Sequence, residues 1–236
     1  MTEALLVGIV FLATVLQTTS GFGFALMAMP MVSLVVGVRA AAPLVAMAGF
    51  TLYAVNLVRY HRSLNRQELL RLAVPTAIGV PVGIWMLSNL PEQTIKTALG
   101  VVLIVYALYA VARPQARPVV SDLWAYPVGF VAGCLGGAFN TPGPPVVVYG
   151  DLKHWPRDEF RSLLQALFLG SSALVIAGHA AAGHITPTTW RSYALIVPFL
   201  LLGIVVGSAI DRRLNGDQFR RLVVAMILAT GVLLIV

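Results

Sequence analysis

Long apolar stretches separated by short polar turns run through the whole chain. The weak, roughly ten-residue alternation that marks the strands of a membrane β-barrel is absent. A chain in lipid has to satisfy its backbone hydrogen bonds internally, so these stretches are interpreted as helices. They are Ala4–Thr19, Phe24–Val38, Pro43–Val58, Leu69–Leu87, Thr94–Ala112, Leu123–Phe139, Pro144–Gly150, Phe160–Ala182, Tyr193–Ile210 and Phe219–Val236. The pattern predicts an all-α polytopic membrane protein.

The composition agrees with this interpretation and excludes several classes of protein. Of the 236 residues, 58% are hydrophobic and 11% are charged, whereas soluble domains carry about 25% charged residues. At roughly 20 residues per span, the chain holds about eight to ten membrane segments and no extramembrane domain. A soluble enzyme, a nucleic-acid-binding protein and a secreted disulfide scaffold are excluded, the last because Cys134 is the only cysteine.

The order of features is the same in the two halves of the chain, which indicates an internal duplication. A Val-Pro pair at 74–75 precedes Gly-x-x-x-Gly at 79–83, and a Val-Pro pair at 197–198 precedes Gly-x-x-x-Gly at 203–207. Chance is the alternative, because glycine and proline are common in membrane helices. The glycine pairs themselves are typical of close helix packing. The expected units are a first membrane repeat (1–112), a linker (113–122) and a second membrane repeat (123–236).

The positions of lysine and arginine indicate how the two repeats are oriented. Each repeat opens with a glycine-broken segment followed by three transmembrane helices. If the broken segments form hairpins, the repeats are inverted and the basic residues divide 13 to 3 between the two sides; if each crosses once, the repeats are parallel and the division is 7 to 9. Cytoplasmic loops concentrate Lys and Arg, so the inverted arrangement is favoured. It places both termini on the outer side.

A short stretch in the second half indicates a re-entrant arm. Pro144–Gly150 would extend only about 10 Å as a helix, and the apolar layer of a bilayer is about 30 Å thick. Whether the broken helices re-enter on one side or cross the membrane twice is left open. Inverted repeats with discontinuous helices near the midplane are a recurrent architecture of secondary transporters.

Two polar interruptions at corresponding places form the candidate substrate site, and we name them the first break (17–23) and the second break (136–145). A new helix is expected after each, and hydroxyls and glycine N–H groups at helix N-termini bind anions. Asn140 or Thr141 is the expected N-cap of the second. Two such sites facing each other would hold a small, doubly charged oxyanion without a buried cation. The predicted binding residues are Gln17, Thr18, Thr19, Ser20, Gly21, Gly23, Asn140, Thr141, Gly143 and Gln165. The alternative is that the breaks are only kinks with close-packing glycines.

Other polar residues within apolar stretches have simpler interpretations. Asn56, Gln165 and His179 are expected to form interhelical hydrogen bonds. Asn56 and His179 fall at nearly equivalent positions in the two repeats, and the alternative is a polar relay in which His179 carries a proton, because a histidine pKa lies near neutrality. Arg161 is expected to mark the inner membrane interface, with an ion pair to Asp158 as the alternative.

The acidic residues bear on the direction of transport. All nine map to a terminus or a loop of the expected topology, whereas pumps and proton-coupled importers place carboxylates within spans. A dianion tends to leave a cell that is negative inside, by about 2.3 kcal/mol per charge per 100 mV. The pattern therefore favours efflux, or symport of a proton carried on the substrate itself.

The breaks resemble the sulfite exporter TauE/SafE family. The resemblance rests on Gly21-Phe22-Gly23 with Pro30, and above all on the Gly-Pro-Pro-x-x-x-Tyr stretch at 143–149. It covers essentially the whole chain and implies a two-repeat protein of the bacterial inner membrane that moves sulfite, sulfonates or related organic anions. The family's usual run of glycines is replaced here by Phe24-Ala25 and by Asn140-Thr141-Pro142, so the identity of the anion stays open.

The sequence therefore predicts a secondary transporter, an exporter of small anions such as sulfite or organosulfonates, which works by alternating access around the two breaks. A proton- or sodium-coupled importer and a non-transporting membrane assembly subunit are the alternatives. An enzyme is not expected, because the sequence has no His-Glu-x-x-His and no Gly-x-Ser-x-Gly motif. We expect no cofactor and no metal. The expected partners are the lipid bilayer, the anion and a coupling H⁺ or Na⁺; the oligomeric state is left open.

Overall fold

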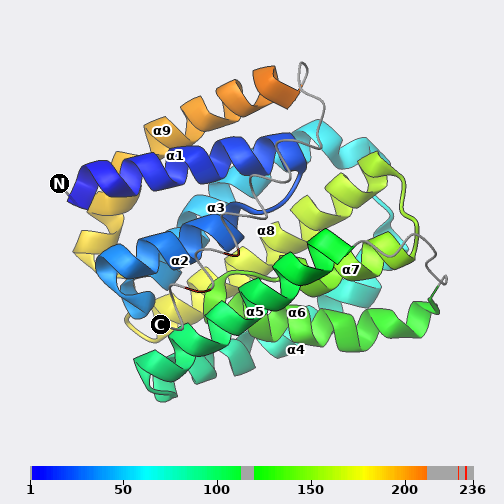
Figure 1. Ribbon diagram of the computed structural model, residues 1–236, viewed down its shortest axis with the longest axis horizontal. Coiled ribbons are helices and arrows are strands. Elements are labelled where there is room, and N and C mark those ends of the chain that lie inside the picture. The colour runs from blue at the N-terminus through cyan, green and yellow to red at the C-terminus, as the bar shows by residue number, and fades with distance from the viewer. Residues whose placement is uncertain (1, 113–119, 212–227, 229–231, 233–236) are drawn as a thin grey trace.

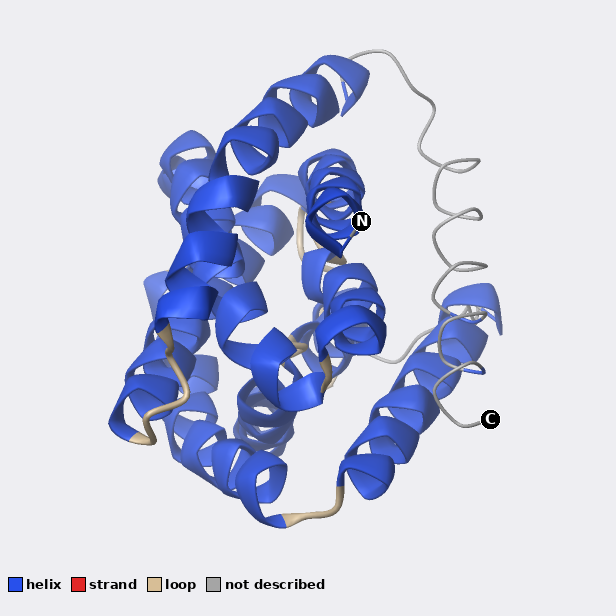
Figure 2. Ribbon diagram, turned by 90° about the vertical axis from the view of Figure 1, so that its left-hand side faces the viewer, coloured by secondary structure: helices blue, strands red, loops and turns tan. Residues whose placement is uncertain are grey.

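The computed structural model describes residues 2–112, 120–211, 228 and 232. Within them it is built of helices joined by short loops (Figures 1 and 2). The α-helices are α1 (Thr2–Ser20), α2 (Phe24–Val36), α3 (Val38–Tyr60), α4 (Arg66–Asn89), α5 (Glu92–Ala112), α6 (Ala125–Phe139), α7 (Gly143–Leu152), α8 (Arg157–Ala181) and α9 (Pro187–Asp211), with 3₁₀ turns η1 (His61–Ser63) and η2 (Asp122–Trp124). The expected span Phe219–Val236 and most of the expected linker lie outside the described residues.

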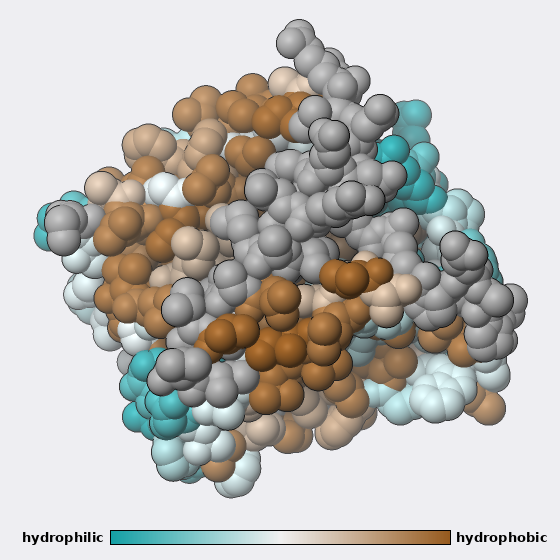
Figure 3. Space-filling view, in the orientation of Figure 1, coloured by the Kyte–Doolittle hydropathy of each residue, from teal (hydrophilic) through white to brown (hydrophobic). Residues whose placement is uncertain are grey.

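The lengths of the helices fit a bilayer. Six of them, α1, α3, α4, α5, α8 and α9, are long and apolar enough to cross a membrane, since a span needs about 20 apolar residues. Helices α2, α6 and α7 have 13, 15 and 10 residues and are shorter than that. Figure 3 shows apolar side chains over the middle of one face, with hydrophilic residues gathered toward its edges. The prediction of an all-α polytopic membrane protein is confirmed.

Glycines hold two pairs of helices in backbone contact, which we name the α4–α6 seam and the α1–α9 seam. A Cβ added to Gly79 or Gly137 would lie 2.3 or 2.2 Å from a carbonyl oxygen of the facing helix. In the other seam, a Cβ added to Gly203 or Gly207 would lie 3.1 or 3.0 Å from a carbonyl oxygen of α1. A side chain in the α4–α6 seam would have to displace the facing backbone, and one in the α1–α9 seam would be tight, so the predicted packing role of the glycine pairs is confirmed.

Helices α3 and α8 form the centre of the molecule and pack against each other. Helix α8 also packs on α4, and α3 packs on α2 and α9, so the two central helices contact both seams. The core contains fully buried aliphatic side chains such as Leu52 of α3 and Leu164 of α8. This packing places α8 beside both helix breaks.

Candidate functional site

The first break separates α1 from α2 at two glycines with left-handed backbone. Gly21 has φ 89° and Gly23 has φ 110°, a region that costs other residues about 1–2 kcal/mol. The side chain of Gln17 closes the gap. Its Oε1 accepts a hydrogen bond from the backbone N–H of Phe24 at 2.9 Å, and its Nε2 donates to the carbonyl of Gly21 at 3.2 Å. The N-terminus of α2 is therefore capped by a side chain from α1.

Helix α8 supplies two further side chains to the first break. Gln165 Nε2 donates to the Gly21 carbonyl at 2.9 Å, and Gln17 Nε2 lies 3.5 Å from Gln165 Oε1. Arg161 donates to the carbonyl of Thr19 at 2.9 Å. The interhelical hydrogen bond expected of Gln165 is confirmed, and the first break and α8 form one buried polar cluster.

Arg161 corrects two expectations. It is only 5% exposed, and it pairs with Asp211 at the end of α9 at 3.1 Å rather than with Asp158. The Arg161 side chain does not simply mark the interface, because it packs against the first break. Its Cγ and Nε lie 3.0 and 3.3 Å from where a Cβ of Gly21 would be. A site at this break without a buried cation was therefore a wrong expectation. The partner of an arginine near the start of an amphipathic helix cannot be assigned from the sequence when, as here, that partner lies 50 positions away in the chain.

The hydroxyls of the first break face their own helix or the α1–α9 seam, and that of Ser20 also contacts the carbonyl of Phe22 within the break. Thr19 Oγ1 donates to the carbonyl of Leu16 at 3.0 Å, and Ser20 Oγ donates to the same carbonyl at 2.7 Å. The Cβ of Thr18 lies 2.8 Å from where a Cβ of Gly207 would be, so Thr18 packs against α9. The structure therefore brings Gln17, Gly21 and Gln165 together and directs Thr18 away from them.

The second break is built differently, and the expected N-cap is wrong. Asn140 ends α6 as its C-cap with φ 56°, and Pro142, which makes no side-chain capping bond, precedes α7. Asparagine adopts this left-handed conformation more readily than most residues. Its Nδ2 donates to the carbonyl of Ala42 in α3 at 2.8 Å. Asn140 thus ties the break to α3 and does not cap α7.

The second break leaves buried polar atoms without partners. Thr141 is 1% exposed, and within the described residues neither its Oγ1 nor Oδ1 of Asn140 has a hydrogen-bond partner. Buried polar groups are almost always paired, so each exception needs an explanation. After Gly143, α7 continues with Pro144 and Pro145, which have no N–H to offer a ligand. The donors that this break offers are therefore side chains more than backbone amides.

Both breaks lie along α8. Gln165 contacts the first, whereas Phe168 Cζ lies 3.4 Å from where a Cβ of Gly143 would be, and Ser171 Oγ lies 2.8 Å from that of Gly136. From Arg161 to Ser171 is about 15 Å of helix. The rings of Phe24 and Phe168 both stack edge-on with Tyr53 of α3, at centroid distances of 6.3 and 5.3 Å. The breaks are close together, and aromatic side chains occupy the space between them.

A buried acid corrects the expectation that all acids lie in loops. Glu68 is 4% exposed, accepts from the hydroxyl of Tyr149 in α7 at 2.7 Å and pairs with Arg71 at 3.1 Å. Asn65 caps α4 by accepting from the Glu68 N–H at 3.2 Å. Asn three residues before Glu is a helix-start signal, and it would have placed Glu68 on a helix.

The ion pair of Glu68 with Arg71 extends to η2 and to the residue after α7. Arg71 also pairs with Asp122 in η2, and so does Lys153 after α7. These two cations hold the pKa of the Asp122 carboxyl below its usual range, Lys153 having the larger effect. The start of α4, the end of α7 and η2 are therefore joined by one chain of charges.

Asn56 and His179 are both buried. His179 Nδ1 lies 2.9 Å from Nδ1 of His184 in the following loop, a local contact rather than the expected bond to another helix. The role of His179 as a proton carrier stays a prediction. Among the described residues, no group of three His, Cys, Asp or Glu side chains could hold a metal ion.

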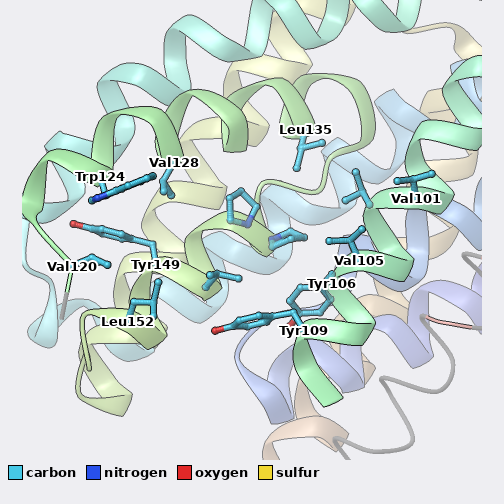
Figure 4. A pocket seen from close by; sticks show the side chains of 14 residues that line it. Val101, Val105, Tyr106, Tyr109, Val120, Trp124, Val128, Leu135, Tyr149 and Leu152 are labelled. Carbon is cyan, nitrogen blue, oxygen red and sulfur yellow. The ribbon is translucent and has the colours of Figure 1, made fainter. Parts of the chain in front are cut away.

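One large cavity is unsuited to an anion. It has a volume of about 560 Å³ and lies between α5 on one side and η2, α6 and α7 on the other. Figure 4 shows that Val101 and Val105 of α5 line it, opposite Val128 and Leu135 of α6. An apolar groove of this kind suits hydrocarbon, so the breaks remain the candidate site.

Comparisons with known proteins agree with a polytopic membrane protein. The family model described as "Sulfite exporter TauE/SafE" matches residues 6–234. A relative from Comamonas testosteroni, "Probable inner membrane transporter protein TsaS", is 22% identical over 157 residues, which cover 66% of each chain and so just under two thirds of that relative. No solved structure gives a significant match. The chain belongs to the sulfite exporter TauE/SafE family, whose members are membrane transporters and not enzymes.

Proposed function

We propose that this protein is a secondary transporter of small anions, such as sulfite or an organosulfonate, and that it works by alternating access around the two helix breaks. The observation that carries the proposal is the position of both breaks against one central helix. Gln165 of α8 binds the carbonyl of Gly21, and Phe168, one turn further along, contacts the position of Gly143. Discontinuous helices of this kind are typical of substrate sites in transporters.

The unpaired atoms of the second break support an oxyanion as substrate. The Thr141 hydroxyl is buried and has no partner within the described residues, so it can donate to an anion at no cost in existing hydrogen bonds. The first break contributes the positive end of α2, although Gln17 already caps its first N–H. Sulfite and sulfonates expose several acceptor oxygens and match such donors.

The contacts between helices support an internal duplication. Helices α1 and α6 each open one half of the chain, and α1 packs on α9 of the second half as α6 packs on α4 of the first. Residue numbers rise together along both seams: Gly203 faces Phe11 and Gly207 faces Val15, while Gly133 faces Thr76 and Gly137 faces Val80. Each pair thus joins one helix of the first half to one helix of the second, and the two pairs correspond to each other. A duplicated unit produces this arrangement.

The positions of the cations support the predicted 13-to-3 division. Arg59 ends α3 and donates to Ser208 near the end of α9 at 2.9 Å, and α8 begins beside α4, with Asn65 bound to Glu159 at 3.0 Å. The opposite end of α3 carries Arg39. Several of the predicted cytoplasmic cations therefore lie at one end; Arg113, Arg117, Arg212, Arg213, Arg220 and Arg221 lie outside the described residues. We propose an inner-membrane location with both termini outside.

Labelling of single cysteines tests this topology, in a chain whose Cys134 is replaced by serine. Cysteines at Glu3 and at Arg191 should react with a membrane-impermeant maleimide added to intact cells. A cysteine at Arg62 should react only after the membrane is opened. Reaction of Glu3 and Arg62 from the same side would contradict the inverted arrangement.

Two alternatives have specific support. The buried Glu68 places a carboxylate against α7, which favours a proton-coupled importer, because such carriers use buried acids. The packing of Phe168 against Gly143 and of Leu16 Cδ2 at 3.2 Å from the Gly23 position favours a non-transporting subunit with filled breaks. Efflux remains our proposal for direction, since the membrane potential drives dianions outward without a coupling ion.

Flux into proteoliposomes tests the proposal. Purified protein is reconstituted, and uptake of sulfite and of methanesulfonate is followed with and without an imposed potential and with and without a proton gradient. We expect saturable sulfite flux that responds to the potential. A flux that requires a proton gradient would indicate the coupled importer. Absence of flux for these anions, in protein that elutes as a single folded species, would reject transport of small oxyanions.

A further inference from the structure

Arg161 is the only strongly buried arginine described at either break, and its surroundings are unusual for an ion pair. One of its terminal nitrogens donates to Asp211 Oδ2, and the other donates to Asp211 Oδ1, each at 3.1 Å. The second nitrogen also donates to the Thr19 carbonyl at 2.9 Å. The guanidinium therefore presents a two-point contact to a carboxylate while its position is fixed by the last turn of α1.

The backbone of the first break makes room for this side chain. The nearest Arg161 atom lies 3.0 Å from where a Cβ of Gly21 would be, so a residue larger than glycine would push the arginine out of its place. Gln165, one turn along α8, binds the carbonyl of the same glycine. The arginine and the polar cluster of the break are consequently one assembly.

Asp211 has another partner at the surface. Arg157, whose side chain is 73% exposed, lies 3.4 Å from Asp211 Oδ1. Asp211 can therefore leave Arg161 and keep a counter-charge, which lowers the cost of separating the pair.

On the basis of the proposed function, we infer that Arg161 is the cationic contact for the transported oxyanion, which takes the place of Asp211 on its guanidinium. Two oxygens of sulfite or of a sulfonate match the two N–H donors that Asp211 now occupies, and arginine suits such two-point contacts better than lysine. Competition by Asp211 weakens binding and so allows release. Displacement of Asp211 also removes its bonds to Arg161 and leaves the end of α9 held to α8 through Arg157, which links occupancy of the site to movement at this end.

Four variants test this inference in the flux assay: Arg161→Lys, Arg161→Gln, Asp211→Asn and the double variant Arg161→Gln/Asp211→Asn. Arg161→Lys should raise KM for sulfite about tenfold, because a bidentate contact becomes a single one. Asp211→Asn should lower KM roughly threefold by removing the competing charge. The double variant removes both charges, so it should keep a melting temperature near that of the wild type and yet transport no sulfite.

The control is Arg191→Gln, which removes an arginine from an exposed pair with Glu3 at 3.6 Å at the other end of α9 and should change neither KM nor the melting temperature. A structural ion pair gives a different result: Arg161→Lys and Asp211→Asn both lower the melting temperature, and KM of the protein that stays folded is unchanged. That result would overturn the inference while wild-type flux leaves the proposed function intact. If the wild type carries no flux, both are rejected together.

Discussion

The two helix breaks meet the same need, irregular backbone inside a membrane, in different ways. The first uses two glycines at positive φ, and glutamine side chains from α1 and α8 pair its exposed carbonyl and N–H. The second uses Asn140 at φ 56° and leaves Thr141 Oγ1 and Asn140 Oδ1 without partners within the described residues. Glutamine side chains thus pair the exposed backbone of the first break, where Thr18 Oγ1, packed toward α9, also lacks a partner within the described residues; at the second break both Asn140 Oδ1 and Thr141 Oγ1 lack one.

We expect this difference to separate the residues that stabilise the fold from those that bind the substrate. Atoms that already have partners hold the fold, and buried atoms that lack them are available to a ligand. We therefore expect changes at the glycines and Gln17 of the first break to act mainly on folding, and changes at Thr141 of the second break, like those at Arg161 of α8, to act mainly on transport. Variants at matched positions in the two breaks can contradict this distinction directly.

The largest expected effect comes from the glycines. Gly21→Ala should lower the free energy of unfolding by about 2–3 kcal/mol, because alanine is strained at φ 89° and its Cβ would displace Arg161. Gly143→Ala should be neutral or slightly stabilising, since the position is the first in a helix and the nearest atom is 3.4 Å away. Thermal melting in detergent measures both. Equal losses in the two variants would show that the breaks do not differ in this way.

The next effect concerns Gln17. Gln17→Leu leaves the buried N–H of Phe24 unpaired and should cost about 2 kcal/mol. Gln17→Glu keeps an acceptor for that N–H but loses the donor to Gly21, so its melting temperature indicates which of the two bonds matters more. A melting temperature unchanged by the leucine variant would mean that α2 finds another cap.

Thr141→Val tests the second break. Valine has the shape of threonine, and the hydroxyl it removes has no partner among the described residues, so stability should stay the same or rise slightly. Sulfite flux should show KM raised about fivefold, as expected for the loss of one hydrogen bond to an anion. Thr141→Ser, which keeps the hydroxyl, should restore KM. A normal KM in the valine variant would exclude Thr141 from the site.

The smallest effect is expected at Ser20, although the sequence placed it beside Thr141 as a binding residue. Its hydroxyl contacts the carbonyls of Leu16 in its own helix and of Phe22 in the break, and such local bonds from a side chain to the backbone add little to stability. Ser20→Ala should therefore change both the melting temperature and KM only slightly. A large rise in KM would return Ser20 to the binding site and weaken the contrast between the breaks.

The sequence was sufficient for the elements that follow local rules. Hydropathy places the long helices, and the glycines at 21 and 23 and the prolines at 142 and 144 locate both breaks. The roles of Asn140 and Arg161 were missed because they depend on which distant residue comes near: Ala42 lies 98 positions from Asn140, and Asp211 lies 50 from Arg161. Glu68 was missed for a local reason, since its capping residue Asn65 was not recognised.

The α1–α9 seam has a consequence for biosynthesis. Helix α1 is among the first segments to leave the ribosome, and the helix that covers its backbone is the last long one described. Until α9 is inserted, the carbonyls of Phe11 and Val15 face lipid or a transient companion, and α4 likewise awaits α6. A protein split between residues 112 and 120 should accordingly accumulate only when both fragments are coexpressed, because each fragment supplies the surface that the other needs to leave the insertion machinery.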